Sequence, residues 1–336
     1  MGSITPSPRS TCPQLITHLQ STLPSPSSRT SLITSVLPSL LTSISQIALI
    51  LRSSHTISAH GTANSFGDDQ LNVDVLTESA IRSAISQPNS SSIITASSEE
   101  HPVEISVHTH FSSNSEQYTI AFDPLDGSSI IPSNWTVGTI IGIWDGPTAL
   151  NQPPATKQIA SLLGVYGPRT TAILAIRLPD APGICLELAL TEENEWIITN
   201  PSLSLELQTK TKYFSPANLR AASSYPAYNE LISGYIKEEY TLRYSGGLVP
   251  DLVHALVKGH GIYLSPVTPN HKAKLRRLYE LCPVALIIEC AGGKAVDERT
   301  GEDILRVEVK GEDERGGIVC GTRVEVDRAM GVLLGQ

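Results

Sequence analysis

The sequence predicts a protein of the α/β class in which helices and sheets form separate layers (layered α+β). Apolar residues recur at helical spacing before residue 85, and residues 118–122 then alternate as a half-buried strand does. Further strand-like segments follow between residues 139 and 198, which is typical of a sheet rich in antiparallel pairs. The length of 336 residues suits about two domains of ordinary size.

The first part of the chain is predicted to be helical. Apolar residues at 15, 16 and 19 indicate a short helix, and the segment 24–31, rich in Pro and Ser, ends it. The spacing of apolar residues from Leu40 to Leu51 indicates a second helix, with Pro38 in its first turn. Asp74 opens a third helical pattern. The apolar runs are shorter than the roughly 18 residues that a membrane span needs.

Strands dominate the middle of the chain, and the last third alternates helices with strands. Strands are expected at 139–144, 172–176, 184–188 and 196–198, and the polar segment 103–115 is expected to be a surface loop. In the last third we expect a helix at 250–258 and strands at 261–264 and 318–321. A boundary at residue 200 would divide the chain into domains 1–200 and 201–336.

Composition limits the partners of the protein and its location. The net charge of −9 argues against binding of nucleic acid and of anionic membrane surfaces. Five cysteines lack paired spacing, which indicates reduced thiols in the cytoplasm. No acidic residue precedes Asp68, and Ser, Thr and Pro are frequent there, so import into an organelle is the alternative.

The central feature is a charged turn after the strand at 118–122. Asp123 and Asp126 lie close together and repel each other unless a cation lies between them, and hard cations such as Mg²⁺ favour oxygen ligands. Pro124 restricts Asp123 to extended geometry, and the backbone N–H groups of residues 127–129 can form an anion-binding concavity. A metal beside a phosphate indicates phosphoryl chemistry. The alternative is an ordinary Asp-Gly hairpin turn.

The segment 123–129, Asp-Pro-Leu-Asp-Gly-Ser-Ser, resembles the signature of the Mg²⁺-dependent, lithium-sensitive sugar and inositol phosphatases. Four further segments resemble motifs of the fructose-1,6-bisphosphatase class 1 family: 67–76, Ser-Glu-Glu at 98–100, Arg-Tyr-x-Gly at 243–246 and Lys-Leu-Arg-x-Leu-Tyr-Glu at 274–280. Ile130 stands where fructose bisphosphatases usually have Asn, and residues 134–144 resemble the sedoheptulose-bisphosphatase branch. Each of these five motifs has another explanation when taken alone. Their occurrence together, in the order that the family has, is explained only by the resemblance.

The resemblance implies a sugar-phosphatase fold of alternating helix and mixed-sheet layers (αβαβα). It also implies hydrolysis of the 1-phosphate of sedoheptulose 1,7-bisphosphate by water, assisted by two or three Mg²⁺ ions, with Mn²⁺ as a possible substitute. The alternatives are fructose 1,6-bisphosphate or both substrates, and a non-catalytic sugar-phosphate sensor. In fructose bisphosphatases the arginine of the Arg-Tyr-x-Gly motif can reach the neighbouring subunit, so a homodimer or homotetramer is expected.

The resemblance assigns a role to each matching residue. The metal ligands would be Asp68, Glu99, Asp123, the Leu125 carbonyl, Asp126 and Glu280, and the acids that activate water would be Asp74 and Glu100. The substrate would be bound by Gly127, Ser128, Ser129, Asn218, Arg243, Tyr244, Tyr263 and Lys274.

Several of these residues have simpler explanations from the sequence alone. An Asp at a helix start is commonly an N-cap, so Asp74 has this alternative. The adjacent Glu99 and Glu100 are typical of a solvated surface pair, and Arg243 with Tyr244 is a common surface pair. The basic segment 272–280 is typical of an exposed helix face.

Overall fold

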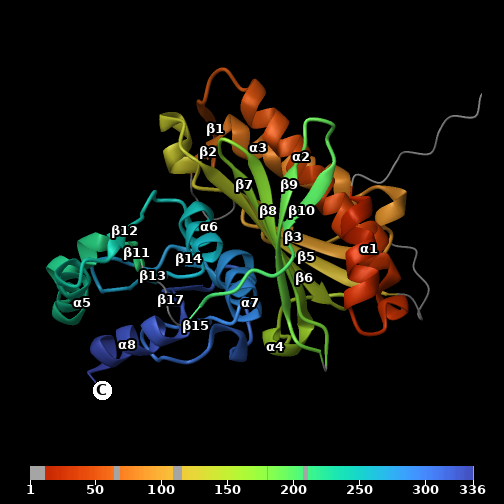
Figure 1. Cartoon of the computed structure of the whole chain (residues 1–336). Helices are drawn as coiled ribbons and strands as arrows, with labels where there is room; N and C mark the ends of the chain where they lie inside the picture. The colour runs from red at the N-terminus through yellow and green to blue at the C-terminus, as the bar shows by residue number, and fades with distance from the viewer. Residues whose placement is uncertain (1–11, 64–68, 109–115, 180, 207–210, 336) are drawn as a thin grey trace, which may run out of the picture.

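The computed structural model describes residues 12–63, 69–108, 116–179, 181–206 and 211–335. Helices and sheets alternate in five layers, with α1 to α3 outermost on one side and α5 and α8 outermost on the other (Figure 1). This confirms the predicted layered class and the αβαβα order. Asp68, one of the predicted metal ligands, lies outside the described residues.

The first layer consists of α1 (Pro13–Thr22), α2 (Leu37–Ser53) and α3 (Asn72–Ile85). A π-helical turn, Leu32–Val36, runs directly into α2, so the helix is continuous from Leu32 to Ser53. This helix of 22 residues is long and apolar enough to cross a membrane. The expectation that no segment reaches the length of a membrane span, which rests on uninterrupted apolar runs, is therefore wrong. Most of the segment is buried, because its apolar residues pack into the core against the sheet. This is the environment of a core helix.

The second layer is an eight-stranded sheet with the order β10-β9-β8-β7-β6-β5-β3-β4. All neighbours are antiparallel except the parallel pair of β3 and β5. The strands are β3 (Ile93–Ser98), β4 (Ile105–Ser106), β5 (Tyr118–Asp126), β6 (Val137–Asp145), β7 (Gln158–Tyr166), β8 (Thr170–Ile176), β9 (Ile184–Leu190) and β10 (Trp196–Asn200). A separate hairpin, β1 (Ala59–Ala63) and β2 (Asp69–Leu71), precedes α3. The short edge strand β4 lies in the segment predicted to be a loop.

The central strands of this sheet are buried on both faces, because helices cover each side. Every residue of β5 and β7 is buried, so these strands read as continuous apolar runs broken only by site residues and small polar ones. The third layer, α6 (Leu248–Lys258) and α7 (Cys282–Cys290), fills the space between the two sheets. A second π-helical turn, Arg277–Leu281, leads into α7.

The fourth layer is a five-stranded sheet with the order β12-β11-β13-β17-β15. Its strands are β11 (Tyr213–Pro216), β12 (Thr241–Leu242), β13 (Ile262–Ser265), β15 (Lys294–Val296) and β17 (Ile318–Gly321). The outer helices α5 (Pro226–Lys237) and α8 (Arg323–Leu334) cover its far face and share an apolar cluster with it. Two strands outside the sheet, β14 (Leu275–Arg276) and β16 (Arg315–Gly316), pair with each other. The segment 275–281 is therefore a strand and a buried turn, so the exposed helix face is the wrong alternative.

The first sheet and α6 meet in unusually close contact at Gly138 of β6. A methyl group on Gly138 would lie 2.4 Å from Cβ of Val249, in the first turn of α6. Only a residue without a side chain allows this approach, so glycine here fixes the distance between the sheet and the N-terminus of α6.

We expect the substitution Gly138→Ala to destabilise the protein, because overpacking at this contact costs about 1–3 kcal/mol. The matched control is Gly311→Ala, since a methyl group on Gly311 meets no atom within 4 Å. Urea unfolding followed by circular dichroism measures both variants. Equal unfolding midpoints for the two would show that α6 moves away from the sheet without cost.

Candidate metal and phosphate site

The charged turn at the end of β5 has the conformation that its sequence requires. Asp123 accepts a hydrogen bond from the Leu125 N–H at 2.9 Å, which holds the carboxylate over the turn. Gly127 has φ +88, in the left-handed region that favours glycine, and a short 3₁₀ segment, Ser128–Ser133, follows it. The strand therefore ends in a turn that places two carboxylates and a run of backbone N–H groups together.

A buried hydroxyl pair supports this turn from β6 and β7. Thr139 donates a hydrogen bond to the Pro124 carbonyl at 2.8 Å, and its hydroxyl lies 2.7 Å from that of Tyr166. Neither residue was singled out from the sequence, where both belong to ordinary strand patterns. The pair satisfies a buried carbonyl that would otherwise be costly.

Three carboxylates from distant parts of the chain meet beside the turn. Glu99, Asp123 and Glu280 each offer an oxygen, and these oxygens all lie within 4.8 Å of one another. Glu99 follows β3, which pairs in parallel with β5, and Glu280 belongs to the π-helical turn before α7. Asp123 and Glu280 are buried and Glu99 is half-buried. The solvated surface pair is thus the wrong alternative for Glu99.

The electrostatics of this carboxylate cluster are unfavourable when nothing compensates the charge. Burial, followed by the charge of Glu99, raises the pKa of Asp123 and of Glu280 well above the ordinary values. Carboxylates that are both buried and close together are stable as anions only next to positive charge. The arrangement therefore suits a bound cation.

Arg276 supplies one positive charge at the edge of the carboxylate cluster. Its side chain is buried and forms an ion pair with Glu99, and its backbone N–H donates to Glu280. No pattern in the sequence indicated a role for Arg276. Its position four residues before Glu280 was the available signal, but a basic segment is commonly exposed.

Asp126 lies at the N-terminus of α6. One oxygen accepts a hydrogen bond from the Leu248 N–H at 3.1 Å, and the other accepts one from the Val249 N–H at 2.7 Å. The first N–H groups of a helix have no partner within the helix, and its dipole favours a negative charge there. Asp126 thus joins β5 to α6, and its role as a metal ligand remains a prediction, as does that of the Leu125 carbonyl.

Asp74 lies in the first turn of α3 and has one oxygen without a partner. Its Oδ2 accepts a hydrogen bond from the Leu71 N–H at 2.8 Å. Leu71 is the N-cap of α3 and Asp74 is the third residue of the helix, so the N-cap alternative is wrong, although Asp74 helps to cap the helix from this position. Its Oδ1 is buried and has no hydrogen-bond partner among the described residues. Burial, with the charge of Glu100 in addition, raises the pKa of Asp74 to about 6. Such a carboxyl can exchange a proton near neutral pH.

The loop at residues 244–247 covers the turn from the other side. A methyl group on Gly127 would lie 3.5 Å from the Cα of Gly247, so the two backbones are in contact. Asp251 of α6 accepts hydrogen bonds from the Ser245 N–H at 2.7 Å and from the Gly246 N–H at 3.4 Å, which holds the loop in place. Asp251 is a further site residue that the sequence did not reveal, because it resembles any acid in a first helical turn.

Tyr244 is the first residue of this loop, and Tyr263 lies near it. Tyr263 of β13 is buried, and burial, with the charge of Asp251 in addition, raises its pKa well above the ordinary value. Tyr244 is exposed and faces the charges of Asp251 and Arg220. Two neutral hydroxyl groups, one buried and one exposed, thus lie beside the loop and can donate hydrogen bonds to a phosphate.

The remaining predicted substrate residues are more dispersed. The Asn218 amide donates a hydrogen bond to the Pro266 carbonyl at 2.7 Å. The Arg243 guanidinium lies 5.7 Å from the centre of the Tyr213 ring and is exposed. Lys274 and Ser129 are exposed, and Ser128 is half-buried. These side chains are accessible to a ligand.

The donor set tests whether a metal fits here. The cluster of Glu99, Asp123 and Glu280 offers oxygen ligands only, which suits a hard divalent cation rather than a soft one. The pKa of Asp123 and of Glu280 is raised by burial and by the neighbouring carboxylates, and a divalent cation would offset both effects. The residues present therefore fit a metal of the Mg²⁺ or Mn²⁺ type.

Two family models match nearly the whole chain. The model described as fructose-1-6-bisphosphatase, N-terminal domain, matches residues 11–201, and that of the C-terminal domain matches residues 207–333. The chain belongs to the fructose-1,6-bisphosphatase family. The family assignment and the enzyme class, a phosphatase of sugar bisphosphates, confirm the predictions from the sequence motifs.

Individual relatives include both branches of this family. The chloroplastic sedoheptulose-1,7-bisphosphatase of Triticum aestivum is 39% identical over 283 residues, which cover 84% of this chain and 68% of that protein. A fructose-1,6-bisphosphatase class 1 of Syntrophotalea carbinolica is 34% identical over 274 residues, covering 80% and 79%. A crystal structure from Toxoplasma gondii, provisionally assigned as a sedoheptulose-1,7 bisphosphatase, aligns with TM-score 0.85 and 32% identity, covering 96% and 98%.

We expect Mg²⁺ to stabilise the protein through the carboxylate cluster. A cation at about 100 times its Kd adds about 2.7 kcal/mol to the free energy of unfolding, which raises Tm by several degrees. Asp123→Asn should abolish this rise, and without metal its Tm should equal or exceed that of the wild type, because one repelling charge is removed. Thermal unfolding with MgCl₂ and with EDTA measures both effects.

The control for this prediction is Glu192→Gln, which removes an exposed acid far from the cluster and should keep the full Mg²⁺ effect. A Mg²⁺-dependent rise of Tm that persists in Asp123→Asn would contradict the assignment of Asp123 to the metal site.

Proposed function

We propose that the protein hydrolyses the 1-phosphate of sedoheptulose 1,7-bisphosphate, giving sedoheptulose 7-phosphate and inorganic phosphate. The observation that carries this proposal is the buried carboxylate cluster next to the turn at residues 123–129. The higher identity to a sedoheptulose bisphosphatase than to a fructose bisphosphatase supports the choice of substrate. A non-catalytic sensor is disfavoured, because the sequence retains all seven acids that the activity would need: Asp68, Asp74, Glu99, Glu100, Asp123, Asp126 and Glu280.

Members of this family are metal-dependent phosphatases, and we propose Mg²⁺ as the metal, with Mn²⁺ as a substitute. Glu99, Asp123 and Glu280 would hold it, with Asp68, Asp126 and the Leu125 carbonyl as further ligands for two or three ions. Mg²⁺ bound there would polarise the phosphoryl group and stabilise the leaving alkoxide.

The protein's own residues would handle the proton and the substrate. Asp74, with Glu100 beside it, would accept a proton from the attacking water through its unpartnered Oδ1. The backbone N–H groups of Gly127, Ser128 and Ser129 would bind the 1-phosphate. Fixing both ends of the sugar holds the reactive phosphate in line with the water. The 7-phosphate and the sugar would be bound by Asn218, Arg243, Tyr244, Tyr263 and Lys274.

We propose that residues 1–200 provide most of the metal site and residues 201–336 most of the sugar-phosphate site, with Glu280 shared between them. Because the Arg243 side chain is exposed, it is able to reach a second subunit, and we propose a homodimer or homotetramer. A cytoplasmic location, with import into an organelle as the alternative, remains a prediction.

The substrate is tested by phosphate release from purified protein with Mg²⁺ at equal, sub-saturating concentrations of two bisphosphates. We expect a higher kcat/KM for sedoheptulose 1,7-bisphosphate than for fructose 1,6-bisphosphate. The reverse preference would keep the mechanism and change the substrate, and no release from either would favour the sensor alternative.

Asp74→Asn should lower kcat by about 10²- to 10⁴-fold, because the amide cannot accept a proton. In the wild type, kcat should fall as the pH decreases through about 6, where Asp74 becomes protonated and loses its capacity as a base. Steady-state rates from pH 5 to 9, with Glu192→Gln as the control, measure both effects. An Asp74→Asn variant with wild-type kcat would exclude Asp74 as the base.

A further inference from the structure

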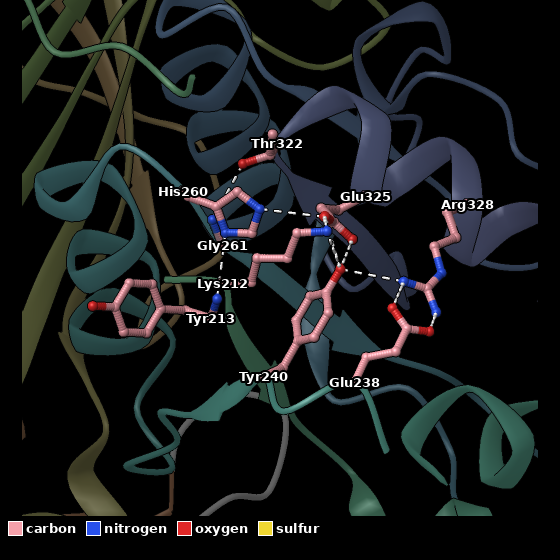
Figure 2. A network of polar contacts seen from close by, with 9 residues as sticks. All are labelled: Lys212, Tyr213, Glu238, Tyr240, His260, Gly261, Thr322, Glu325 and Arg328. Atoms are coloured by element: carbon pink, nitrogen blue, oxygen red, sulfur yellow. Dashed lines mark hydrogen bonds and ion pairs between the residues drawn. The ribbon is translucent and has the colours of Figure 1, made fainter. Parts of the chain in front are cut away.

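Another buried carboxylate, that of Glu325, lies far from the metal site, in the first turn of α8. Glu325 is 3% exposed, and both of its oxygens accept a hydrogen bond from the Tyr240 hydroxyl, at 2.9 and 2.8 Å (Figure 2). His260 Nε2 lies 3.3 Å and Lys212 Nζ 3.4 Å from Oε1. Burial raises the pKa of Glu325, but the hydrogen bonds from His260 and Tyr240 outweigh it and lower the pKa to about 2. The group is an anion with three partners.

His260 connects this anion to the backbone of β11. Its Nδ1 accepts a hydrogen bond from the Tyr213 N–H at 3.3 Å, so Nδ1 carries no proton. The proton is then on Nε2, which faces Glu325 (Figure 2). His260 is buried, and its ring contacts both Glu325 of α8 and Tyr213, the first residue of β11. The ring therefore links the position of β11 to that of α8.

Tyr240 connects the same anion to β12, which begins at the next residue. Its hydroxyl also accepts hydrogen bonds from Lys212 Nζ at 3.1 Å and from Arg328 Nη1 at 3.2 Å. Arg328 in turn forms a two-pronged ion pair with Glu238. The Glu325 network therefore holds the starts of β11 and β12 against the N-terminal half of α8.

These two strands lead directly to the proposed sugar-phosphate site. Asn218 follows β11, and Arg243 and Tyr244 follow β12. The Arg243 N–H donates to the Phe214 carbonyl of β11 at 3.0 Å, so the two segments move together. β12 is only two residues long and lies at the edge of the sheet, with β11 as its one neighbour. Such a short edge strand needs side-chain anchoring to keep one position.

We infer that Glu325, Tyr240 and Lys212 are positioning residues that fix Arg243 and Tyr244 for the phosphate remote from the cleaved bond. The inference rests on the proposed function, which places that phosphate at Arg243 and Tyr244. The three residues act through β12 on substrate binding at one end only, so they leave the carboxylate cluster and Asp74 unaffected.

The test compares two substrates, sedoheptulose 1,7-bisphosphate and sedoheptulose 1-phosphate, which lacks the remote phosphate. Tyr240→Phe should raise KM for the bisphosphate about fivefold to tenfold, with kcat changed by less than about twofold. For the monophosphate, kcat/KM should stay within about twofold of the wild type. The matched control is Tyr235→Phe, because the buried Tyr235 hydroxyl in the same aromatic cluster has no hydrogen-bond partner among the described residues. Its loss should change the kinetic constants of neither substrate.

Lys212→Met is a second variant, which keeps the aliphatic stem of a half-exposed side chain and so should fold even where Tyr240→Phe does not. It should also raise KM for the bisphosphate alone. An unchanged KM for the bisphosphate in both variants, or an equal loss with both substrates, would overturn the inference. If the wild type releases phosphate from neither substrate, the proposed function fails instead.

Discussion

The mutual repulsion of carboxylates buried in a low-dielectric interior is the constraint on which the rest of this structure depends. Glu99, Asp123 and Glu280 converge from β3, β5 and the turn before α7, and within the described part of the chain Glu99 alone of the three forms an ion pair, with Arg276. Burial of like charges costs several kcal/mol, which folding must offset elsewhere. The buried apolar residues between the five layers of helices and sheets form a core large enough to offset this cost.

The N-terminus of α6 is the point where the two halves of the site are joined. Asp126 accepts hydrogen bonds from its first N–H groups, Gly138 allows Val249 to approach the sheet, and Asp251 holds the loop at 244–247. One helix thus sets the distance between the carboxylate cluster and the residues proposed to bind the sugar phosphate. At the outer edge of the second sheet, the Glu325 network anchors β11 and β12 and so sets the position of the residues that follow these strands.

Sequence patterns predicted most elements, because a helix buried on one face repeats apolar residues at helical spacing, and a strand buried on both faces forms a short run rich in apolar residues. The helices α2, α3 and α6 and the strands β5, β6 and β8 lie where periodicity placed them. The patterns gave a wrong prediction where a segment is buried although its own sequence does not repeat apolar residues. Residues 275–281 carry basic side chains and resemble an exposed helix, yet Arg276 is buried because Glu99 neutralises it. The helix from Leu32 to Ser53 proved long enough to span a membrane because a π-helical turn extends it.

The sequence by itself determined the family, the enzyme class and the order of the motifs, because the residues of each motif, such as Asp123 and Asp126, lie within a few positions of one another in the chain. It also identified Glu99 and Glu280 as acids with a role, but only by resemblance. The tertiary structure alone decided that these two meet Asp123, that Arg276 compensates Glu99, and that Asp126 caps α6. It also decided that one oxygen of Asp74 has no hydrogen-bond partner among the residues that the structure describes. The reason is physical: the contacts of Glu99, Glu280, Arg276 and Asp126 join segments far apart in the chain, and local propensity contains no information on such contacts.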